Sequence, residues 1–390
     1  MASLLASPRM LRPVEAPLSR WARDHLAAAC AGAGVELDGP DPWDPGIHRE
    51  RALARILMHG TLGAGESYVD GDWDCDALDE MTARLLRGGV DRVLSSRPRE
   101  VAHVVAARLF NHQTVRRART SIEAHYDLGN DLYAAMLGPT MTYSCGYWRT
   151  ATTLDQAQHA KHELIARKLG LEPGQHVLDI GCGWGEFARF AAERYGAYVT
   201  GITLSAGQAQ LARSRCVGLP VAIHVRDYRE LCGRFDHIVS VGMFEHVGPR
   251  NYRTFFDTAA RLLEPGGLLL IHTIGGLSST DSIDPWIDRY VFPDAVLPSA
   301  AELTRAFEGT FVLEDWHSFG ADYDRTLMAW HRRLARAWPK LGRRHDDRFR
   351  RLWRYYLLTC AGSFRARRNQ LWQLVLSPTG VPDGYRRPEA

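Results

Sequence analysis

Residues 177–185 read VLDIGCGWG, and this short stretch decides the fold of the chain. An apolar run ends at Ile180, and glycines follow at positions 181, 183 and 185. Such glycines let the backbone turn tightly and approach a bound ligand closely, and a helix starts where they end. The stretch therefore predicts a strand, a tight turn and a helix, with a nucleotide-like ligand at the turn.

Short apolar runs alternate with helical segments from residue 174 onward, which is the pattern of a parallel sheet covered by helices. We expect strands at 176–180, 198–202, 221–225, 237–241, 268–272, 311–316 and 371–376. Helices are expected between them at 187–195, 206–214, 250–263 and 300–307. In an open α/β sheet of this kind, ligands bind at the carboxyl ends of the strands, so the chemistry should lie just after these runs.

The region before the sheet has a different character. Residues 16–118 lack strand alternation and predict short helices at 18–31, 49–58, 76–86 and 98–110, with a polar, glycine-rich connection at 63–73. A chain of 390 residues is too long for one domain of about 150 residues. We therefore divide it into a mainly helical N-terminal domain, residues 1–118, and a catalytic domain, residues 119–390.

The composition is that of a globular protein, with 45% hydrophobic and 24% charged residues. Seven cysteines, an odd number without a CxxC pair, indicate neither a disulfide framework nor a structural metal site. The first thirty residues make a poor signal peptide, and the apolar stretch 266–277 is shorter than the roughly 20 residues that a membrane-spanning helix needs. We expect a cytoplasmic protein without a metal.

A strong charge asymmetry marks the C-terminal part. The chain carries +3 overall, but residues 331–368 contain thirteen Lys and Arg against Asp346 and Asp347, a net +11 that leaves −8 elsewhere. Such a segment predicts an anionic partner, nucleic acid or phospholipid; a solvated helix face and packing against the N-terminal helices are the alternatives. Aromatic residues interleaved with these charges suit a membrane interface: Trp338, Trp353, Tyr355 and Tyr356.

The residues of the glycine turn limit the choice of ligand. A dinucleotide fingerprint beginning at Gly181 requires a glycine at 186, where the chain has Glu186. Asp179, two residues before the glycines, would repel a pyrophosphate but suits a cationic ligand that carries hydroxyls and an amine. S-adenosylmethionine is such a ligand. An ordinary glycine-rich turn is the structural alternative.

Six further motifs stand in a fixed order along the chain: YDLGND (126–131), YSC (143–145), VGMFEHVG (241–248), HTIG (272–275), DPW (284–286) and GADYD (320–324). With the glycine turn, they make residues 50–377 resemble the cyclopropane-fatty-acyl-phospholipid synthase family of class I methyltransferases. The resemblance implies a Rossmann-like sheet behind a smaller helical domain, S-adenosylmethionine as cofactor, and a homodimer. It also implies an unsaturated phospholipid substrate and no nucleic acid, with the protein at the inner face of a membrane.

The resemblance and the turn together give ten candidate cofactor-binding residues. Gly181 and Gly183 would lie under the methionine end, with Tyr143 and Ser144 closing over it, while Asp227 and Tyr228 would hold the adenine. Thr203 and Gln208 replace the acidic residue that usually binds the ribose hydroxyls, although helix capping is an alternative role for them. The complete set is Tyr143, Ser144, Asp179, Gly181, Gly183, Thr203, Leu204, Gln208, Asp227 and Tyr228.

Methylene addition to a cis double bond also needs a base, because ring closure removes a proton from the added methyl group. The family uses bound bicarbonate, and five residues match its anion site: Cys145, Glu245, His272, Ile274 and Tyr323. Backbone N–H groups, His272 and Tyr323 would donate to the anion, and Glu245 would accept its proton. Taken singly, Cys145 suits a buried small hydrophobe, His272 a core residue and Glu245 a helix start.

Three other functions remain open. A relative could stop at methyl addition and make a branched chain, or it could methylate a small amine. The fold could also serve as a lipid carrier without activity, although the glycines, Gln208 and Glu245 argue against this. In the lipid-modifying case an apolar tunnel must receive the acyl chain, and Leu109 and Phe110 of the N-terminal region are candidates for its wall.

Overall fold

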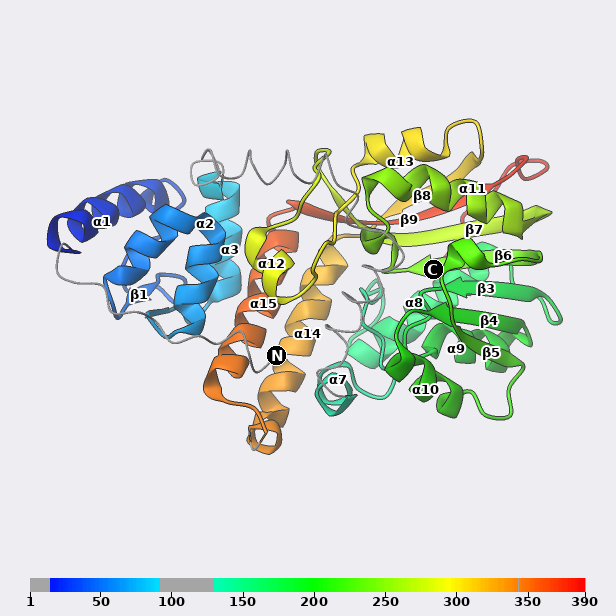
Figure 1. Cartoon of the computed structure of the whole chain (residues 1–390), viewed down its shortest axis with the longest axis horizontal. Helices are drawn as coiled ribbons and strands as arrows, with labels where there is room; N and C mark the ends of the chain where they lie inside the picture. The colour runs from blue at the N-terminus through cyan, green and yellow to red at the C-terminus, as the bar shows by residue number, and fades with distance from the viewer. Residues whose placement is uncertain (1–14, 92–129, 343, 390) are drawn as a thin grey trace.

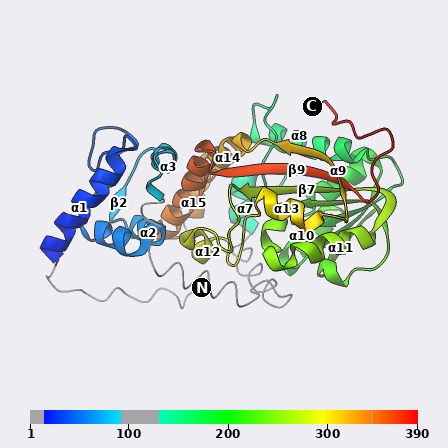
Figure 2. The same ribbon diagram turned by 90° about the horizontal axis from the view of Figure 1, so that it is seen from above.

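The computed structural model describes residues 15–91, 130–342 and 344–389. Three parts follow one another across the described molecule: N-terminal helices, a long helical pair, and a sheet covered by helices on both faces (Figures 1 and 2). The helix expected at 98–110, with Leu109 and Phe110, lies outside the described residues, as do residues 126–129 of the first motif and the domain boundary at 118.

The sheet has seven strands in the order β5-β4-β3-β6-β7-β9-β8. Strands β3 to β7 run parallel to one another, and β9 is antiparallel to both β7 and β8. All seven expected strands are present: β3 (His176–Ile180), β4 (Tyr198–Thr203), β5 (Val221–Val225), β6 (Phe235–Val241), β7 (Leu263–Gly276), β8 (Val312–Ser318) and β9 (Asn369–Ser377). Because β4 and β6 flank β3, the strand order reverses at the glycine turn, where such sheets bind ligands.

Alternate residues of the strands pack on opposite faces of the sheet, as the period of two requires. Val177 joins a core with one group of helices, and its neighbour Leu178 joins a core with the other. The first group is α8 (Leu154–Leu169), α9 (Glu186–Tyr195) and α10 (Ala206–Arg215). The second group is α11 (Tyr252–Leu262) and α13 (Ala300–Phe307).

The N-terminal region is helical, as expected, and packs on two long helices from the far end of the chain. It contains α1 (Glu15–Ala31), β1 (Gly46–Ile47), α2 (Arg51–Val69), β2 (Trp73–Asp74) and α3 (Leu78–Arg87). The long helices are α14 (Ala321–Leu341) and α15 (Asp347–Arg365), with α7 (Asn130–Leu137) and α12 (Pro285–Tyr290) beside them. One apolar core joins these elements, so residues 320–365 are shared between the N-terminal helices and the sheet.

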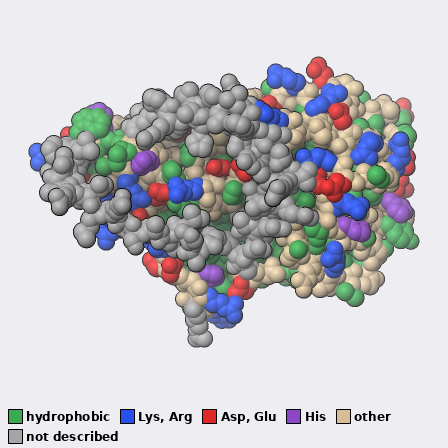
Figure 3. Space-filling model, viewed as in Figure 1, with side chains coloured by type: hydrophobic (Ala, Val, Ile, Leu, Met, Phe, Trp, Pro, Cys, Tyr) green, Lys and Arg blue, Asp and Glu red, His purple; other side chains and the backbone are tan. Residues whose placement is uncertain are grey.

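Packing against the N-terminal helices, one of the alternatives for the basic segment 331–368, accounts for several of its charges. Seven of its twelve described Lys and Arg residues pair with carboxylates: Arg333 with Asp155, Arg344 with Asp131, Arg348 with Asp70, Arg350 with Asp347, Arg351 with Asp74, Arg365 with Asp79 and Arg368 with Asp91. On the face drawn in Figure 3, Lys and Arg side chains lie among Asp and Glu wherever the described surface is visible. The −8 outside the segment therefore neutralises much of its +11.

The aromatic residues of this segment are also not an exposed membrane interface. Trp353, Tyr355 and Tyr356 are 2%, 8% and 4% exposed and belong to the core between the N-terminal helices and the sheet. Trp338 is half-buried and stacks on Phe349. A helix that is basic on one side and aromatic on the other fits an interior interface as well as a lipid surface, because the periodicity is the same in both.

Residues 63–68, expected as a polar connection, form part of α2 instead. The helix is kinked at Gly60, whose φ is 57°, and then continues to Val69. A Cβ on Gly65 would come within 2.3 Å of the Trp286 ring, so this glycine allows close packing rather than a turn. Across the described residues, no helix combines the length and apolar character needed to cross a membrane.

Candidate active site

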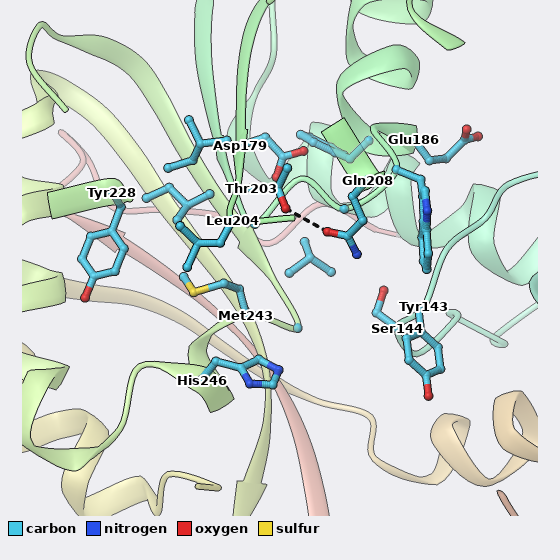
Figure 4. A pocket seen from close by; sticks show the side chains of 18 of the residues that line it. Tyr143, Ser144, Asp179, Glu186, Thr203, Leu204, Gln208, Tyr228, Met243 and His246 are labelled. Carbon is cyan, nitrogen blue, oxygen red and sulfur yellow. Dashed lines mark hydrogen bonds between the residues drawn. The ribbon is translucent and has the colours of Figure 1, made fainter. Parts of the chain in front are cut away.

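A pocket opens at the carboxyl ends of β3 and β4, beside the glycine turn (Figure 4). It holds about 1200 Å³ including its open mouth, enough for a nucleoside-sized ligand. Gly181 and Gly183 have φ values of 84° and 53°, a region that favours glycine. A Cβ on Gly181 would meet Met243 at 2.7 Å, whereas no atom lies within 4 Å of the Cβ position of Gly183. The turn therefore presents bare backbone to the pocket.

All ten candidate cofactor residues line this one pocket. They come from five places in the chain: the segment before α8, strand β3 and its turn, the end of β4, the first turn of α10, and the segment after β5. Figure 4 shows Tyr143 and Ser144 on one side of the space, with Asp179, Thr203 and Gln208 across from them. The ten candidates therefore surround one space: Gly181 and Leu204 directly follow strands that end at this edge, whereas Tyr143 comes from the segment before α8.

Thr203 and Gln208 are held together by their side chains. The Thr203 hydroxyl donates to Gln208 Oε1 at 2.8 Å, which leaves the Gln208 amide nitrogen on the pocket side (Figure 4). The cap of α10 is Ser205, whose Oγ accepts from the Gln208 backbone N–H at 3.2 Å. The capping alternative therefore belongs to Ser205, and the Thr203–Gln208 pair presents neutral polar groups where ribose hydroxyls would lie.

Asp227 and Asp179 differ in their surroundings. Both oxygens of Asp227 accept bonds from Arg229, at 2.8 and 2.7 Å, and the carboxylate also caps the short helix η1 (Tyr228–Glu230). Asp179 is buried, its Oδ2 has no partner within the described chain, and burial raises its pKa to about 7. An uncompensated carboxylate beside the glycine turn fits a ligand that carries an ammonium group there.

Glu245 and Ile274 meet behind this pocket. Glu245 lies in η2 (Phe244–His246), between two pocket-lining residues, Met243 and His246. Its Oε1 accepts from the Ile274 backbone N–H at 2.7 Å, so that amide holds Glu245 in place. Oε2 is buried and has no hydrogen-bond partner among the described residues, and burial raises the pKa of the carboxyl to about 7.

His272 precedes Ile274 by two residues in β7, so both side chains lie on the same side of the strand. The Nδ1 atom of His272 is 3.2 Å from the Gln373 amide on the neighbouring strand β9, while Nε2 is buried and has no partner in the described part of the chain. Burial lowers the His272 pKa well below its usual value, so the ring is neutral at physiological pH.

Cys145 packs against α14, the helix that carries Tyr323. The Cys145 thiol is fully buried 3.8 Å from the Thr326 hydroxyl, and the neighbouring Gly146 N–H donates to that hydroxyl at 3.1 Å. Thr326 stands one helical turn after Tyr323 in α14. Burial raises the pKa of Cys145 well above its usual value, which keeps it a neutral thiol. The Phe319 ring contacts His272 and also Tyr147, which lies two residues after Cys145.

Two groups of site residues were not found from the sequence. His246 lines the pocket, and burial lowers its pKa to about 4. The second group, Lys161 and His162, belongs to α8, a helix that the strand patterns did not predict. A signal for α8 was present: Thr153 and Gln156 form a capping box, and Gly170 ends the helix with φ 62°.

This chain is similar to known cyclopropane synthases and to a fatty acid methyltransferase. A family model described as mycolic acid cyclopropane synthetase matches residues 113–374. The cyclopropane-fatty-acyl-phospholipid synthase of Escherichia coli strain K12 is 47% identical over 380 residues, 97% of this chain and 99% of that protein. The tuberculostearic acid methyltransferase UfaA1 of Mycobacterium tuberculosis is 35% identical, over 90% of this chain and 87% of its own.

The solved structure of a cyclopropane synthase is also similar to this chain. The mycolic acid cyclopropane synthase CmaA1, complexed with SAH and CTAB, is 32% identical and superposes with a TM-score of 0.62. The match covers 66% of this chain and 97% of that chain.

Proposed function

This chain belongs to the mycolic acid cyclopropane synthetase family and is an S-adenosylmethionine-dependent methyltransferase, and from that premise we propose that it adds a methylene group across the cis double bond of unsaturated phospholipid acyl chains. The relative with 47% identity, which spans nearly the whole chain, carries this activity in its name. Bound bicarbonate is the proposed base. The ten pocket residues are the proposed cofactor site.

One observation supports this function over simple methyl transfer. Two buried side-chain atoms have no hydrogen-bond partner among the described residues: Glu245 Oε2, and Nε2 of His272, which lies two residues before Ile274, the residue that holds Glu245. Buried polar atoms of folded proteins are normally hydrogen-bonded, so two such atoms fit a small polar guest. Transfer to an amine needs no such base site. A proton-accepting guest beside the methyl donor suits ring closure.

The protein itself supplies orientation and an apolar environment. S-adenosylmethionine supplies an electrophilic methyl group, but an isolated double bond is a weak nucleophile, and its alignment can contribute roughly 7–11 kcal/mol of the barrier. Aromatic rings surround Tyr143: Trp330 at 5.1 Å and Phe292 at 6.2 Å between ring centroids, with its hydroxyl donating to Tyr356 at 2.9 Å. Their faces favour positive charge on a substrate carbon and exclude water.

The proposed base site follows from the same geometry. Glu245 would accept a hydrogen bond from a bound bicarbonate at Oε2, while the Ile274 N–H donates to Oε1, so the Ile274 amide would position Glu245 rather than the anion. The neutral His272 ring can carry a proton on Nε2 and donate, because Nδ1 can accept from Gln373. Bicarbonate, when bound there, supplies the base for the proton lost in ring closure.

We also propose that the protein acts as a homodimer at a membrane surface. Two large apolar side chains of the N-terminal helices, Trp21 and Met58, are each 51% exposed, and hydrophobic groups gather near α1 in Figure 3. Three cations of α14 form no ion pair within the described chain and are exposed four residues apart on one helix face: Arg332, Arg336 and Lys340. Such features suit an anionic lipid surface. Light scattering on the purified protein should give twice the chain mass.

The direct test is a product analysis. The purified protein is incubated with S-adenosylmethionine and vesicles of a monounsaturated phosphatidylglycerol, and the fatty acids are examined by mass spectrometry before and after mild hydrogenation. We expect a gain of one CH₂ in a product that takes up no hydrogen. A product that gains CH₂ and still takes up hydrogen would be a methylated alkene.

That methylated alkene is the second candidate. It is favoured by the 35% identity to a tuberculostearic acid methyltransferase over most of the chain. The hydrogenation step separates the two products, because the ring has no double bond to reduce. A saturated methyl branch would further require a reductant, so its appearance without one would exclude both candidates.

A further inference from the structure

Helix α8 presents three buried polar side chains to the segment that covers the pocket. Gln158, Lys161 and His162 stand three and four residues apart and therefore share one helix face. The Gln158 amide donates to the Ser144 carbonyl at 2.8 Å, and Lys161 Nζ donates to the Ser144 hydroxyl at 2.7 Å. His162 Nε2 lies 3.3 Å from the Thr142 hydroxyl. The helix thus fixes residues 142–144 beside the cofactor pocket.

Lys161 differs from the other two because it is a cation. Its side chain is fully buried and lines the pocket, yet within the described chain no carboxylate forms an ion pair with it. An ammonium group has three N–H donors, and the Ser144 hydroxyl takes one of them. A buried charge without a counter-ion is costly, so its place in a ligand pocket points to an anionic group on the ligand.

The other cations of the pocket are not equivalent. Arg229 is committed to Asp227, and Arg226 is exposed beyond the end of β5, near the proposed adenine position. Lys161 lies instead near the carboxylates of Asp179 and Glu186, beside the glycine turn, and Glu186 is already paired with Arg215. Asp179 keeps one oxygen without a partner. This end of the pocket therefore offers one unpaired cation and one unpaired anion.

We propose that Lys161, with the Ser144 hydroxyl, binds the carboxylate of the cofactor's amino-acid moiety, while Asp179 binds its ammonium group. The inference rests on S-adenosylmethionine being the cofactor, because that ligand carries one group of each charge at its methionine end. Lys161 is then a specificity residue that selects cofactors with an intact amino acid.

The titration behaviour of the two groups agrees with this pairing. Burial lowers the Lys161 pKa to about 7 and raises the Asp179 pKa to about 7, so neither is fully charged at neutral pH in the free protein. Burial opposes the charged form of Lys161, and the nearby carboxyl groups of Glu186 and Asp179 favour it. A ligand carboxylate would shift Lys161 further toward its charged form.

The test compares two ligands that cannot transfer a methyl group. Isothermal titration calorimetry measures the Kd of S-adenosylhomocysteine and of its decarboxylated analogue, S-adenosyl-3-thiopropylamine, for the wild-type protein and for Lys161→Met. We expect the wild type to bind S-adenosylhomocysteine about 10- to 100-fold more tightly than the analogue, the range of a charge-assisted hydrogen bond. In Lys161→Met this ratio should fall to about threefold or less.

Lys168→Met is the matched control. Lys168 is the other buried lysine of α8, two turns further on, where it pairs with Asp315 at 2.8 Å and does not line the pocket. Its substitution should leave the ligand ratio unchanged. If Lys161→Met does not fold, as judged by its thermal melt, Lys161→Gln takes its place, since Gln keeps a donor toward Ser144 without the charge.

Two results would overturn the proposal: a wild-type ratio near one, or a ratio that survives loss of the lysine charge. The second result would assign Lys161 to the anion behind the pocket, near Cys145 and His272, whose pKa values its charge also affects. Neither ligand involves the lipid. The ratio of ligand affinities can therefore be as expected even if the proposed lipid reaction fails. Equally, the lipid reaction can occur even if the ratio contradicts the role of Lys161.

Discussion

Replacing Glu245 by Gln should stabilise the protein at alkaline pH while it removes activity. Burial raises the pKa of this carboxyl from 4.5 to about 7, so folding opposes its ionisation. The protonated carboxyl therefore makes its full contribution to folding stability below pH 4.5, and this contribution is lost as the pH rises through about 7. At pH 8 the folded protein carries an ionisation penalty of about 3 kcal/mol, at 1.36 kcal/mol per pKa unit.

Gln cannot ionise, so it avoids this penalty. It keeps an oxygen to accept from the Ile274 N–H, but places an amide nitrogen where Oε2 has no partner, at a cost of about 1–3 kcal/mol. That cost does not depend on pH. Between pH 5 and pH 8 the change in unfolding free energy caused by Glu245→Gln should therefore shift in favour of the variant by about 2–3 kcal/mol.

Urea unfolding followed by tryptophan fluorescence at both pH values measures this shift, and the exposed Glu308→Gln is the control. The same variant should lose about 100-fold or more in turnover, the range for a group that takes part in proton transfer, while its Kd for S-adenosylhomocysteine stays unchanged. Equal effects on stability at pH 5 and pH 8 would refute a buried, ionisable Glu245. Unaltered turnover would remove it from the mechanism.

Three further predictions concern the pH profile, the turn and the surface. Wild-type turnover at saturating cofactor should rise with pH through about 7, because Glu245 must be ionised to accept a proton; a flat pH–rate profile from 6 to 8 would contradict this. Gly181→Ala, at φ 84°, should lower both the melting temperature, by about 2–4 °C per kcal/mol of strain, and the affinity for S-adenosylhomocysteine in calorimetry. Arg332→Glu with Arg336→Glu should weaken binding to anionic vesicles at low salt in a sedimentation assay, with little change in thermal stability. Arg351→Glu should instead destabilise the fold, because Arg351 pairs with Asp74. The reverse pattern would show that the exposed pair, Arg332 and Arg336, is structural.

Sequence patterns predicted the sheet well because each strand is a buried, β-rich apolar run between turn residues. All seven strands lie where they were expected, and only their ends differ: β7 runs from Leu263 to Gly276 rather than over 268–272 alone. The extension at residues 273–276 pairs with β9, a contact between residues about a hundred positions apart, and Leu263 at the other end pairs with Phe235 of β6. Local periodicity carries no information on such partners.

The pocket was predictable for the same reason, since parallel strands bring their following residues to one edge. The role of the basic segment was not. Arg351 meets Asp74 and Arg348 meets Asp70 across more than 270 residues, and charge counting cannot tell such ion pairs from a docking surface. Lys161 was missed because a lysine in a helix is usually solvent-exposed, and its burial depends on where α8 packs.

The proposed ring closure depends most on a proton-accepting guest bound by Glu245 and His272 beside the methyl donor. Product formation should therefore be measured by mass spectrometry in buffer stripped of carbonate, and again as bicarbonate is added back. The ring-containing acyl chain should form slowly in the stripped buffer. Its rate of formation should rise with added bicarbonate until it saturates. An equal rate in both buffers, with the same saturated product, would contradict this proposal.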